Sequence, residues 1–228
     1  MQRYPDRTSA GIKLGETLRA ELDAADVVVL ALPRGGVPVG YEVSLALEAP
    51  LDILVVRKLG APFQPELAIG AIAPDGVRVL NHYSVSSYGI SPAVIDEIEA
   101  QEREELARRQ GLYRKGLPPL DVKGKCVVLV DDGLATGATM QAAVEWTLAH
   151  GCGTCVVAVP VASAVTCVML ERYPGVRCIC LATPEPFYAV GEAYRNFDQV
   201  SDDEVITIMA ERSAELRQAG EAKRSTRS

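Results

Sequence analysis

The chain has 228 residues, of which 48% are hydrophobic and 23% charged, and its formal net charge is −7. This is the balance of an ordinary globular protein, and the negative charge argues against general binding to nucleic acid or to an anionic membrane surface. No apolar run approaches the roughly 20 residues that cross a bilayer, and the first residues lack the apolar core of a signal peptide. We therefore expect a single domain over residues 1–228, located in the cytoplasm.

The first part of the chain predicts a helix, a strand and a second helix. Leucines recur at helical spacing between charged residues, after Asp6 or Thr8 as the helix cap. An apolar run then predicts a buried strand, and Pro38 suits the first turn of the next helix. The three elements are expected over residues 7–22, 26–32 and 39–48.

The loop between that strand and its helix, Arg34-Gly35-Gly36, has the composition of an anion site. Paired glycines let the backbone approach a ligand closely, and the arginine adds a positive charge. A simple tight turn is the alternative that this loop alone leaves open.

Two basic residues, Arg57 and Lys58, follow a predicted strand over residues 51–56. Together they can neutralise a diphosphate, although an ordinary solvated basic pair is the alternative. A loop rich in Gly and Pro, residues 59–66, comes next and ends on Glu66. We then expect a hairpin of strands 67–73 and 77–80, followed by a long charged helix that opens at Ser91-Pro92.

The most informative stretch is residues 127–139, Val-Val-Leu-Val-Asp-Asp-Gly-Leu-Ala-Thr-Gly-Ala-Thr. Its apolar start shows no alternation, which predicts a strand buried on both faces. Asp131 and Asp132 follow, and carboxylates suit the hydroxyls of a polyol or a hydrated cation. The next loop offers backbone N–H groups and hydroxyls before a predicted helix over 140–150, which is a natural phosphate cradle. A phosphate beside a polyol describes a ribose 5-phosphate.

The last part of the chain predicts two more strands, 154–159 and 176–182, with a helix over 161–172 between them. Such alternation predicts an α/β fold with a doubly wound, mainly parallel central sheet and right-handed crossovers. Phe187 and Tyr188 come after the last strand. They either stack on a flat acceptor ring or pack their loop onto the core. A helix from Ser201 to about Leu216 and a polar tail, 218–228, end the chain.

Six cysteines leave two interpretations open. Cys152 and Cys155, with Cys178 and Cys180, form two close pairs that suit a four-thiolate zinc site. Both pairs also fall at the start of or inside apolar runs, where small buried thiols are common. We expect buried thiols, and no disulfides in a reducing cytoplasm.

Residues 127–139 closely resemble the phosphoribosyl diphosphate (PRPP) motif of the type I phosphoribosyltransferases: an apolar strand, two acids, three variable residues and Thr-Gly-x-Thr. The resemblance covers roughly residues 25–200. It implies the fold of that family, with a core over about 25–183 and a small hood from the terminal segments, about 1–24 and 184–217. It also implies transfer of the 5-phosphoribosyl group from PRPP to a nitrogen acceptor, usually a nucleobase, with release of diphosphate. The alternative on the same fold is a non-catalytic regulator that senses PRPP or a nucleotide.

The resemblance also assigns residues. It implies that Ala135, Thr136, Gly137, Ala138 and Thr139 bind the 5-phosphate, and that Asp131 and Asp132 bind the ribose hydroxyls. It implies that Arg34, Gly35 and Gly36 bind the diphosphate, with Arg57, Lys58 and Glu66 as the catalytic candidates. Phe187 and Tyr188 are the acceptor-binding candidates. Mg²⁺ is expected to be held mainly by substrate and water, with Asp131 and Asp132 as its protein candidates.

The acceptor site departs from the family pattern. Enzymes for 6-oxopurines carry an Asp where this chain has Ala135, which argues against hypoxanthine and guanine bound in their manner. Enzymes for adenine carry a Glu where this chain has Ala68. Glu66 lies two residues earlier and substitutes for that Glu only if its loop is reorganised. We also expect a homodimer, with no nucleic-acid or membrane partner.

Overall fold

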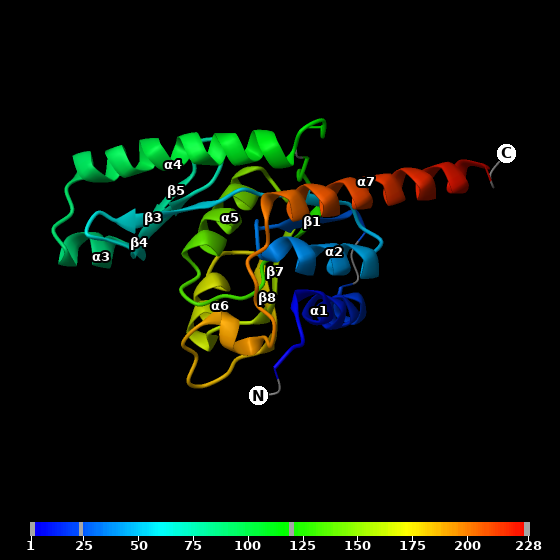
Figure 1. Cartoon of the computed structure of the whole chain (residues 1–228), viewed down its shortest axis with the longest axis horizontal. Coiled ribbons are helices and arrows are strands. Elements are labelled where there is room, and N and C mark those ends of the chain that lie inside the picture. The colour runs from blue at the N-terminus through cyan, green and yellow to red at the C-terminus, as the bar shows by residue number, and fades with distance from the viewer. Residues whose placement is uncertain (1–2, 23–24, 119–120, 226–228) are drawn as a thin grey trace.

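The structure, a computed structural model, describes residues 3–22, 25–118 and 121–225. Its centre is a five-stranded parallel sheet with the strand order β2-β1-β6-β7-β8 (Figure 1). The strands are β1 (Val27–Ala31), β2 (Leu51–Ile53), β6 (Cys126–Val130), β7 (Thr154–Val161) and β8 (Val176–Ala182). The predicted α/β class with a parallel central sheet is confirmed.

Helices cover both faces of this sheet, which explains why β6 is apolar at every position. Helices α1 (Arg7–Glu21) and α2 (Gly36–Ala46) lie on one face, and α5 (Ala138–Ala149) and α6 (Ala164–Leu170) lie on the other (Figure 1). Val128 and Val130 of β6 point into the first layer, whereas Val127 and Leu129 point into the second. All four side chains are fully buried, so an alternating polar residue has no place in this strand.

A second, antiparallel sheet of three strands stands beside the central one. It consists of β3 (Arg57–Ala61), β4 (Gln64–Ile72) and β5 (Arg78–Leu80), and it is joined by α3 (His82–Ser87) and α4 (Pro92–Tyr113). Together these elements form the lobe on the left of Figure 1. The helix α4 begins after its cap Ser91, as predicted. The short α3, which Asn81 caps, was not predicted.

Two predictions over residues 51–66 are wrong. The predicted strand 51–56 stops at Ile53, and Arg57 and Lys58 begin β3 instead of following a strand. The predicted loop 59–66 is mostly paired strand, with its turn at Pro62 and Phe63. Gly60 suggested a loop, but it lies within a strand. A Cβ at this position would collide with the backbone of Pro65, so the glycine allows the two strands to approach closely.

The N-terminal segment pairs with residues 193–196, which precede the last helix. Asp6 caps α1 as predicted, accepting from the Ser9 N–H at 2.7 Å. The Tyr4 N–H donates to the Ala193 carbonyl at 2.8 Å, and the Arg195 N–H donates to the Tyr4 carbonyl at 2.8 Å. Ala193 ends a short 3-10 helix, η1 (Val190–Ala193). The N-terminal segment therefore pairs with residues 193–195, next to the carboxyl end of β7.

The closing helix α7 (Asp202–Ser225) extends past its predicted end near Leu216 and projects from the body (Figure 1). Most of the predicted polar tail is therefore helical. Its polar composition indicates exposure to solvent but does not exclude a helix, because Ala, Glu, Lys and Arg are good helix formers. The final residues of that tail, 226–228, lie outside the described part of the chain.

The described residues contain neither a membrane-spanning helix nor a metal-binding cluster. Among residues 3–22, 25–118 and 121–225, no helix is long and apolar enough to cross a membrane. Within the same ranges, no three His, Cys, Asp or Glu side chains are arranged to hold a metal ion. The six cysteines are free; Cys126 and Cys155 are buried and the other four are half-buried.

Candidate functional site

The strands β1 and β6 are neighbours in the middle of the sheet, and the chain leaves them toward opposite sides. From β1 it continues to β2, and from β6 it continues to β7. In an open parallel sheet, such a reversal of strand order leaves a crevice at the carboxyl ends of the strands, where ligands bind. The loop Arg34-Gly35-Gly36 follows β1, and residues 131–139 follow β6. The fold therefore brings the two predicted anion loops together.

The two loops are in direct contact, and glycine makes the contact possible. A Cβ on Gly35 would overlap the Asp132 carboxylate, and one on Gly36 would lie 2.7 Å from the Val130 carbonyl oxygen. Gly36 also begins α2, and the peptide bond between Pro33 and Arg34 is cis. The backbone of the predicted diphosphate loop thus lies against the predicted ribose carboxylates.

Hydrogen bonds to the end of β7 and to α6 hold the loop of residues 133–137 in place. The Leu134 N–H donates to the Val161 carbonyl at 2.9 Å, and the Thr166 hydroxyl donates to the Ala135 carbonyl at 2.7 Å. Gly137, with φ of 74°, takes a left-handed conformation at the N-cap of α5. Ala135 and Thr136 remain exposed. The loop therefore presents free backbone and a hydroxyl at a helix N-terminus, as a phosphate site requires.

This helix starts at Ala138, two residues before the predicted start at Met140. Ala138 and Thr139 consequently belong to its first turn, where backbone N–H groups have no partner within the helix. All five predicted 5-phosphate residues thus stand at one helix N-terminus, where the helix dipole also favours an anion.

The acidic pair is desolvated. Burial raises the pKa of Asp131 well above its usual value, and the neighbouring Asp132 charge raises it further. Burial also raises the pKa of Asp132, and hydrogen bonding and attraction from Arg7 oppose that rise. The Asp131 carboxylate accepts from the Asp132 N–H at 2.8 Å, which fixes its orientation. Paired carboxylates with raised pKa values in a crevice are typical of a functional site.

Three residues around the acidic pair were missed by the sequence analysis. Arg7, the first residue of α1, donates from Nε to Oδ2 of Asp132 at 2.8 Å. The Tyr194 hydroxyl donates to the Asp132 carbonyl at 2.6 Å, and Phe197 lies under the Arg7 guanidinium. Only the pairing of the N-terminal segment with residues 193–198 brings these side chains to Asp132, so no local pattern in the sequence predicts them.

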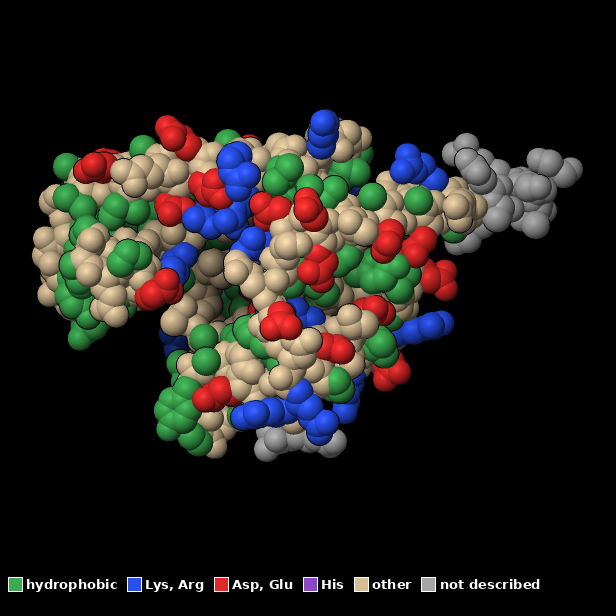
Figure 2. All heavy atoms as spheres, in the orientation of Figure 1, with side chains coloured by type: hydrophobic (Ala, Val, Ile, Leu, Met, Phe, Trp, Pro, Cys, Tyr) green, Lys and Arg blue, Asp and Glu red, His purple; other side chains and the backbone are tan. Residues whose placement is uncertain are grey.

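The predicted basic residues are each paired with a carboxylate. Arg34 contacts Asp202 of α7 at 3.3 Å, Arg57 contacts Glu102 of α4 at 2.7 Å, and Lys58 contacts Glu66 at 3.2 Å. Figure 2 shows Lys and Arg side chains beside Asp and Glu side chains along α4, at the rim of a hollow. An anionic ligand would therefore compete with these carboxylates for the same cations.

The three catalytic candidates share one cavity. Arg57, Lys58 and Glu66 line a space of about 430 Å³ between β3, β4 and α4. Glu66 belongs to β4, where its side chain is 92% exposed and its one described ion pair is to Lys58. In this arrangement Glu66 lies with the basic residues, and it is not among the groups that contact Asp131 or Asp132.

The two acceptor candidates differ in burial. Phe187 packs against the buried cluster that contains Val161 and Tyr194, which is the core-packing alternative, whereas Tyr188 is 76% exposed. Both line a cavity of about 320 Å³ together with Arg3 and Glu192. The Tyr188 ring is thus the one that remains free to stack on a flat ligand.

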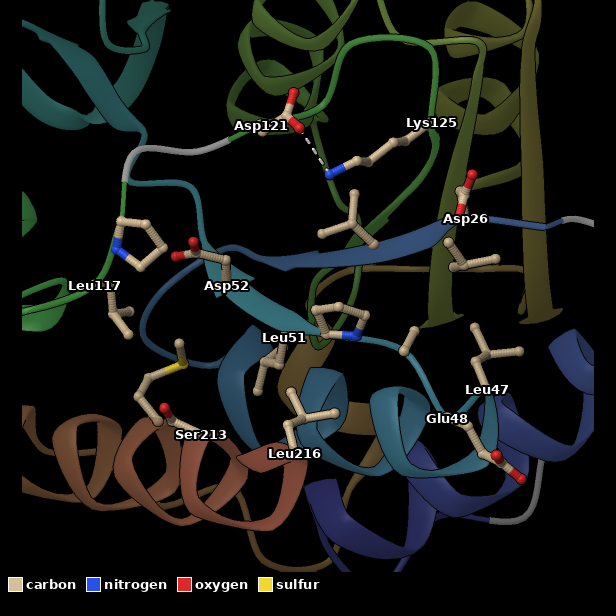
Figure 3. Close-up of a pocket in the computed structure, with 16 residues that line it drawn as sticks. Asp26, Leu47, Glu48, Leu51, Asp52, Leu117, Asp121, Lys125, Ser213 and Leu216 are labelled. Carbon is tan, nitrogen blue, oxygen red and sulfur yellow. Dashed lines mark ion pairs between the residues drawn. The ribbon is translucent and has the colours of Figure 1, made fainter. Parts of the chain in front are cut away.

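A larger cavity lies elsewhere. It measures about 610 Å³ and lies at the amino ends of β1, β2 and β6, beside the segment that joins α2 to β2 and beside α7 (Figure 3). Asp26, Asp52 and Lys125 line it, and none of the predicted site residues does. Because ligands of open parallel sheets bind at the carboxyl ends of strands, this cavity is no part of the candidate site.

Solved structures share this architecture. A crystal structure of TT1426 from Thermus thermophilus matches with a TM-score of 0.77 and 41% identity, covering 92% of this chain and 99% of that one. A hypothetical protein from Neisseria gonorrhoeae with bound ppGpp matches with a TM-score of 0.50 and 15% identity, over 92% of this chain and 95% of that one. The second likeness shows the fold alone.

Sequence relatives point to one family. Two provisionally named phosphoribosyl transferases from two strains of Mycobacterium tuberculosis are 47% identical over 220 residues, which is 96% of this chain. The match covers 49% of each relative, so the chain spans about half the length of these proteins. The family model of the phosphoribosyl transferase domain matches residues 5–194. This match contains both anion loops, the acidic pair and the basic pair. The chain belongs to the phosphoribosyl transferase family.

Proposed function

We propose that the protein binds PRPP and transfers its 5-phosphoribosyl group to a nitrogen acceptor, with release of diphosphate. In this reaction the bond between C1 and the diphosphate oxygen breaks, and a bond between C1 and the acceptor nitrogen forms. The acceptor is proposed to be a nucleobase whose contacts differ from those of the usual oxopurine and adenine enzymes, because Ala135 and Ala68 stand where those carry carboxylates.

The contact between Gly35 and the Asp132 carboxylate carries this proposal. It makes the predicted diphosphate loop adjacent to the predicted ribose carboxylates, with the 5-phosphate loop on the same segment as those carboxylates. PRPP has a phosphate at one end of a ribose and a diphosphate at the other, so three adjacent sites of this chemistry suit it better than they suit a simple sugar phosphate.

The residues present suit Mg²⁺ held largely by the substrate. Asp131 and Asp132 supply the hard oxygen donors that this ion prefers, but Arg7 already occupies one oxygen of Asp132. Within the described residues, no third potential ligand joins them. Bound Mg²⁺ would neutralise charge on the diphosphate, with Asp131 as the best protein candidate to contact it.

The chain's own residues would act mainly by charge. Leaving diphosphate develops negative charge, which Arg34, Arg57 and Lys58 can neutralise once they leave their carboxylate partners. The Asp131 and Asp132 carboxylates would accept hydrogen bonds from the ribose hydroxyls and hold C1 in place. Glu66, beside Lys58, is proposed as a contact to the acceptor only after the β3–β4 hairpin has moved.

The double variant Asp131→Asn/Asp132→Asn tests the donor. We expect it to lose measurable PRPP binding in isothermal titration calorimetry, since amides cannot replace two carboxylate acceptors toward hydroxyls. Asp203→Asn, an exposed change on α7, is the matched control and should bind as the unmodified protein does. Unchanged binding by the double variant would overturn the assignment.

Turnover separates the enzyme from the alternative, a non-catalytic sensor of PRPP or a nucleotide. The protein is incubated with PRPP, Mg²⁺ and a panel of purine and pyrimidine bases, and diphosphate release is measured. Release with at least one base supports the transferase. Binding of PRPP without release from any base would favour the sensor.

A further inference from the structure

Arg7 is an almost buried cation beside the acidic pair. Its side chain is 11% exposed, that of Asp132 is 13% exposed, and Nε lies 2.8 Å from Oδ2. A charge this far from water needs a partner, and a second carboxylate, Asp131, stands next in the chain. In the described part of the chain, Arg7 is the one residue that forms an ion pair with either acid. The guanidinium is therefore the counter-charge of the pair.

Arg7 is itself held in place on two further sides. Nη1 donates to the Asp198 carbonyl at 2.7 Å, and the guanidinium carbon lies 3.9 Å from the centroid of the Phe197 ring. Phe197 stacks on Tyr194 with ring centroids 5.1 Å apart, and the Tyr194 hydroxyl donates a hydrogen bond to the Asp132 backbone carbonyl. The contacts form a closed circuit from Asp132 through Arg7, Phe197 and Tyr194 back to Asp132, which leaves the Asp132 side chain one orientation.

We propose that Arg7 is a positioning residue of the ribose site: it fixes the Asp132 carboxylate for the sugar hydroxyls and offsets the charge of the acidic pair. The role rests on the proposed PRPP-binding function. Two neighbouring carboxylates repel each other, although the sugar hydroxyls need both of them as acceptors. A guanidinium paired with Asp132 lowers that mutual repulsion and holds the carboxylate in one orientation.

Arginine is suited to this position and lysine is less so. The planar guanidinium donates toward Asp132 and toward the Asp198 carbonyl while its face stacks on Phe197. A lysine ammonium keeps the charge but cannot combine a fork of donors with a stacked face. The variants Arg7→Lys and Arg7→Gln therefore separate the charge from the geometry.

The test compares a ligand that contains ribose with one that lacks it. PRPP and inorganic diphosphate, each with Mg²⁺, are titrated calorimetrically into the full chain and its variants. For Arg7→Gln we expect PRPP affinity to fall roughly tenfold or more, as loss of a charged hydrogen bond implies, while diphosphate affinity stays within about twofold. Arg7→Lys should fall in between. Arg19→Gln, an exposed arginine on the same helix, is the matched control and should leave both affinities unchanged.

The outcomes are distinct. Equal losses for PRPP and diphosphate would reveal a long-range charge effect, and an unchanged PRPP affinity would reveal a purely structural ion pair; either result overturns the role of Arg7. If circular dichroism shows that Arg7→Gln does not fold, the same affinity ratio is measured for Arg7→Lys and Phe197→Leu, and an unchanged ratio in both overturns the role. Failure of the unmodified protein to bind PRPP would instead overturn the proposed function, and this role with it.

Discussion

At the scale of residues, Thr166 shows how much of the site depends on side chains outside the motif. It is buried on α6, its hydroxyl donates to the Ala135 carbonyl, and its methyl group fills the space beside Gly137. The Thr166 side chain thus fixes the positions of both Ala135 and Gly137 in the predicted 5-phosphate loop. A loop that binds through its backbone depends on such support, because small displacements move several N–H groups at once.

Replacing this hydroxyl should weaken the loop without leaving a cavity. Thr166→Val keeps the shape but leaves the Ala135 carbonyl without its donor, which we expect to cost about 1–2 kcal/mol of unfolding free energy and several-fold in PRPP affinity. Thr166→Ser, which retains the hydroxyl, is the control and should bind PRPP nearly normally. Urea denaturation and calorimetric titration measure both quantities. Normal binding by Thr166→Val would show that the loop holds its shape unaided.

At the scale of elements, the start of α7 competes with the proposed diphosphate for Arg34. Asp202 accepts from Arg34 at 3.3 Å and from the Tyr113 hydroxyl at 2.5 Å. Those two hydrogen bonds lower the pKa of Asp202, Tyr113 contributing more than Arg34, so the carboxylate is ionised at neutral pH. A diphosphate has to draw Arg34 away from it.

Removing that carboxylate should therefore strengthen anion binding. We expect Asp202→Asn to bind inorganic diphosphate about threefold more tightly, the modest size reflecting a partly exposed ion pair. Asp203→Asn, the next residue of the same helix turn, has no described contact with Arg34 and should have no effect. Titration of both variants at one ionic strength checks this. Weaker binding by Asp202→Asn would mean that Asp202 holds Arg34 ready for the ligand and does not compete for it.

At the scale of the whole molecule, the proposed ligand would bridge the loops after β1 and β6 and, through Arg7, the N-terminal segment and residues 193–198. A ligand that binds only the folded state stabilises it by mass action. At a PRPP concentration one hundred times Kd, the gain is about 2.7 kcal/mol, or roughly 5–10 °C in Tm for a chain of this size. Differential scanning fluorimetry with Mg²⁺ present measures the shift. The Asp131→Asn/Asp132→Asn variant should show none, and an equal shift in that variant would place binding elsewhere.

Some features of this protein follow from short stretches of its chain. The unbroken apolar run of β6 predicts burial on both faces, and the structure confirms it, because helices cover each side of the sheet. The cap at Asp6 and the start of α4 after Ser91 follow equally from local chemistry. The acidic pair and both glycine-containing loops were also identified from residue types alone. The homodimer and the cytoplasmic location stay predictions.

Other features depended on contacts between distant segments, which no local pattern contains. Gly60 was interpreted as a loop residue because glycine is common in loops. Its actual role is to let the backbone of Pro65 approach closely, and that contact exists only once the two strands have paired. Arg7 reaches Asp132 because the sheet order places the end of β6 beside the N-terminal segment, which pairs with Tyr194. The sequence by itself determined most of the elements, the two anion loops and the family. Tertiary structure decided that these loops touch, and that an arginine from the first helix pairs with Asp132, because charge compensation in a buried site depends on proximity in space.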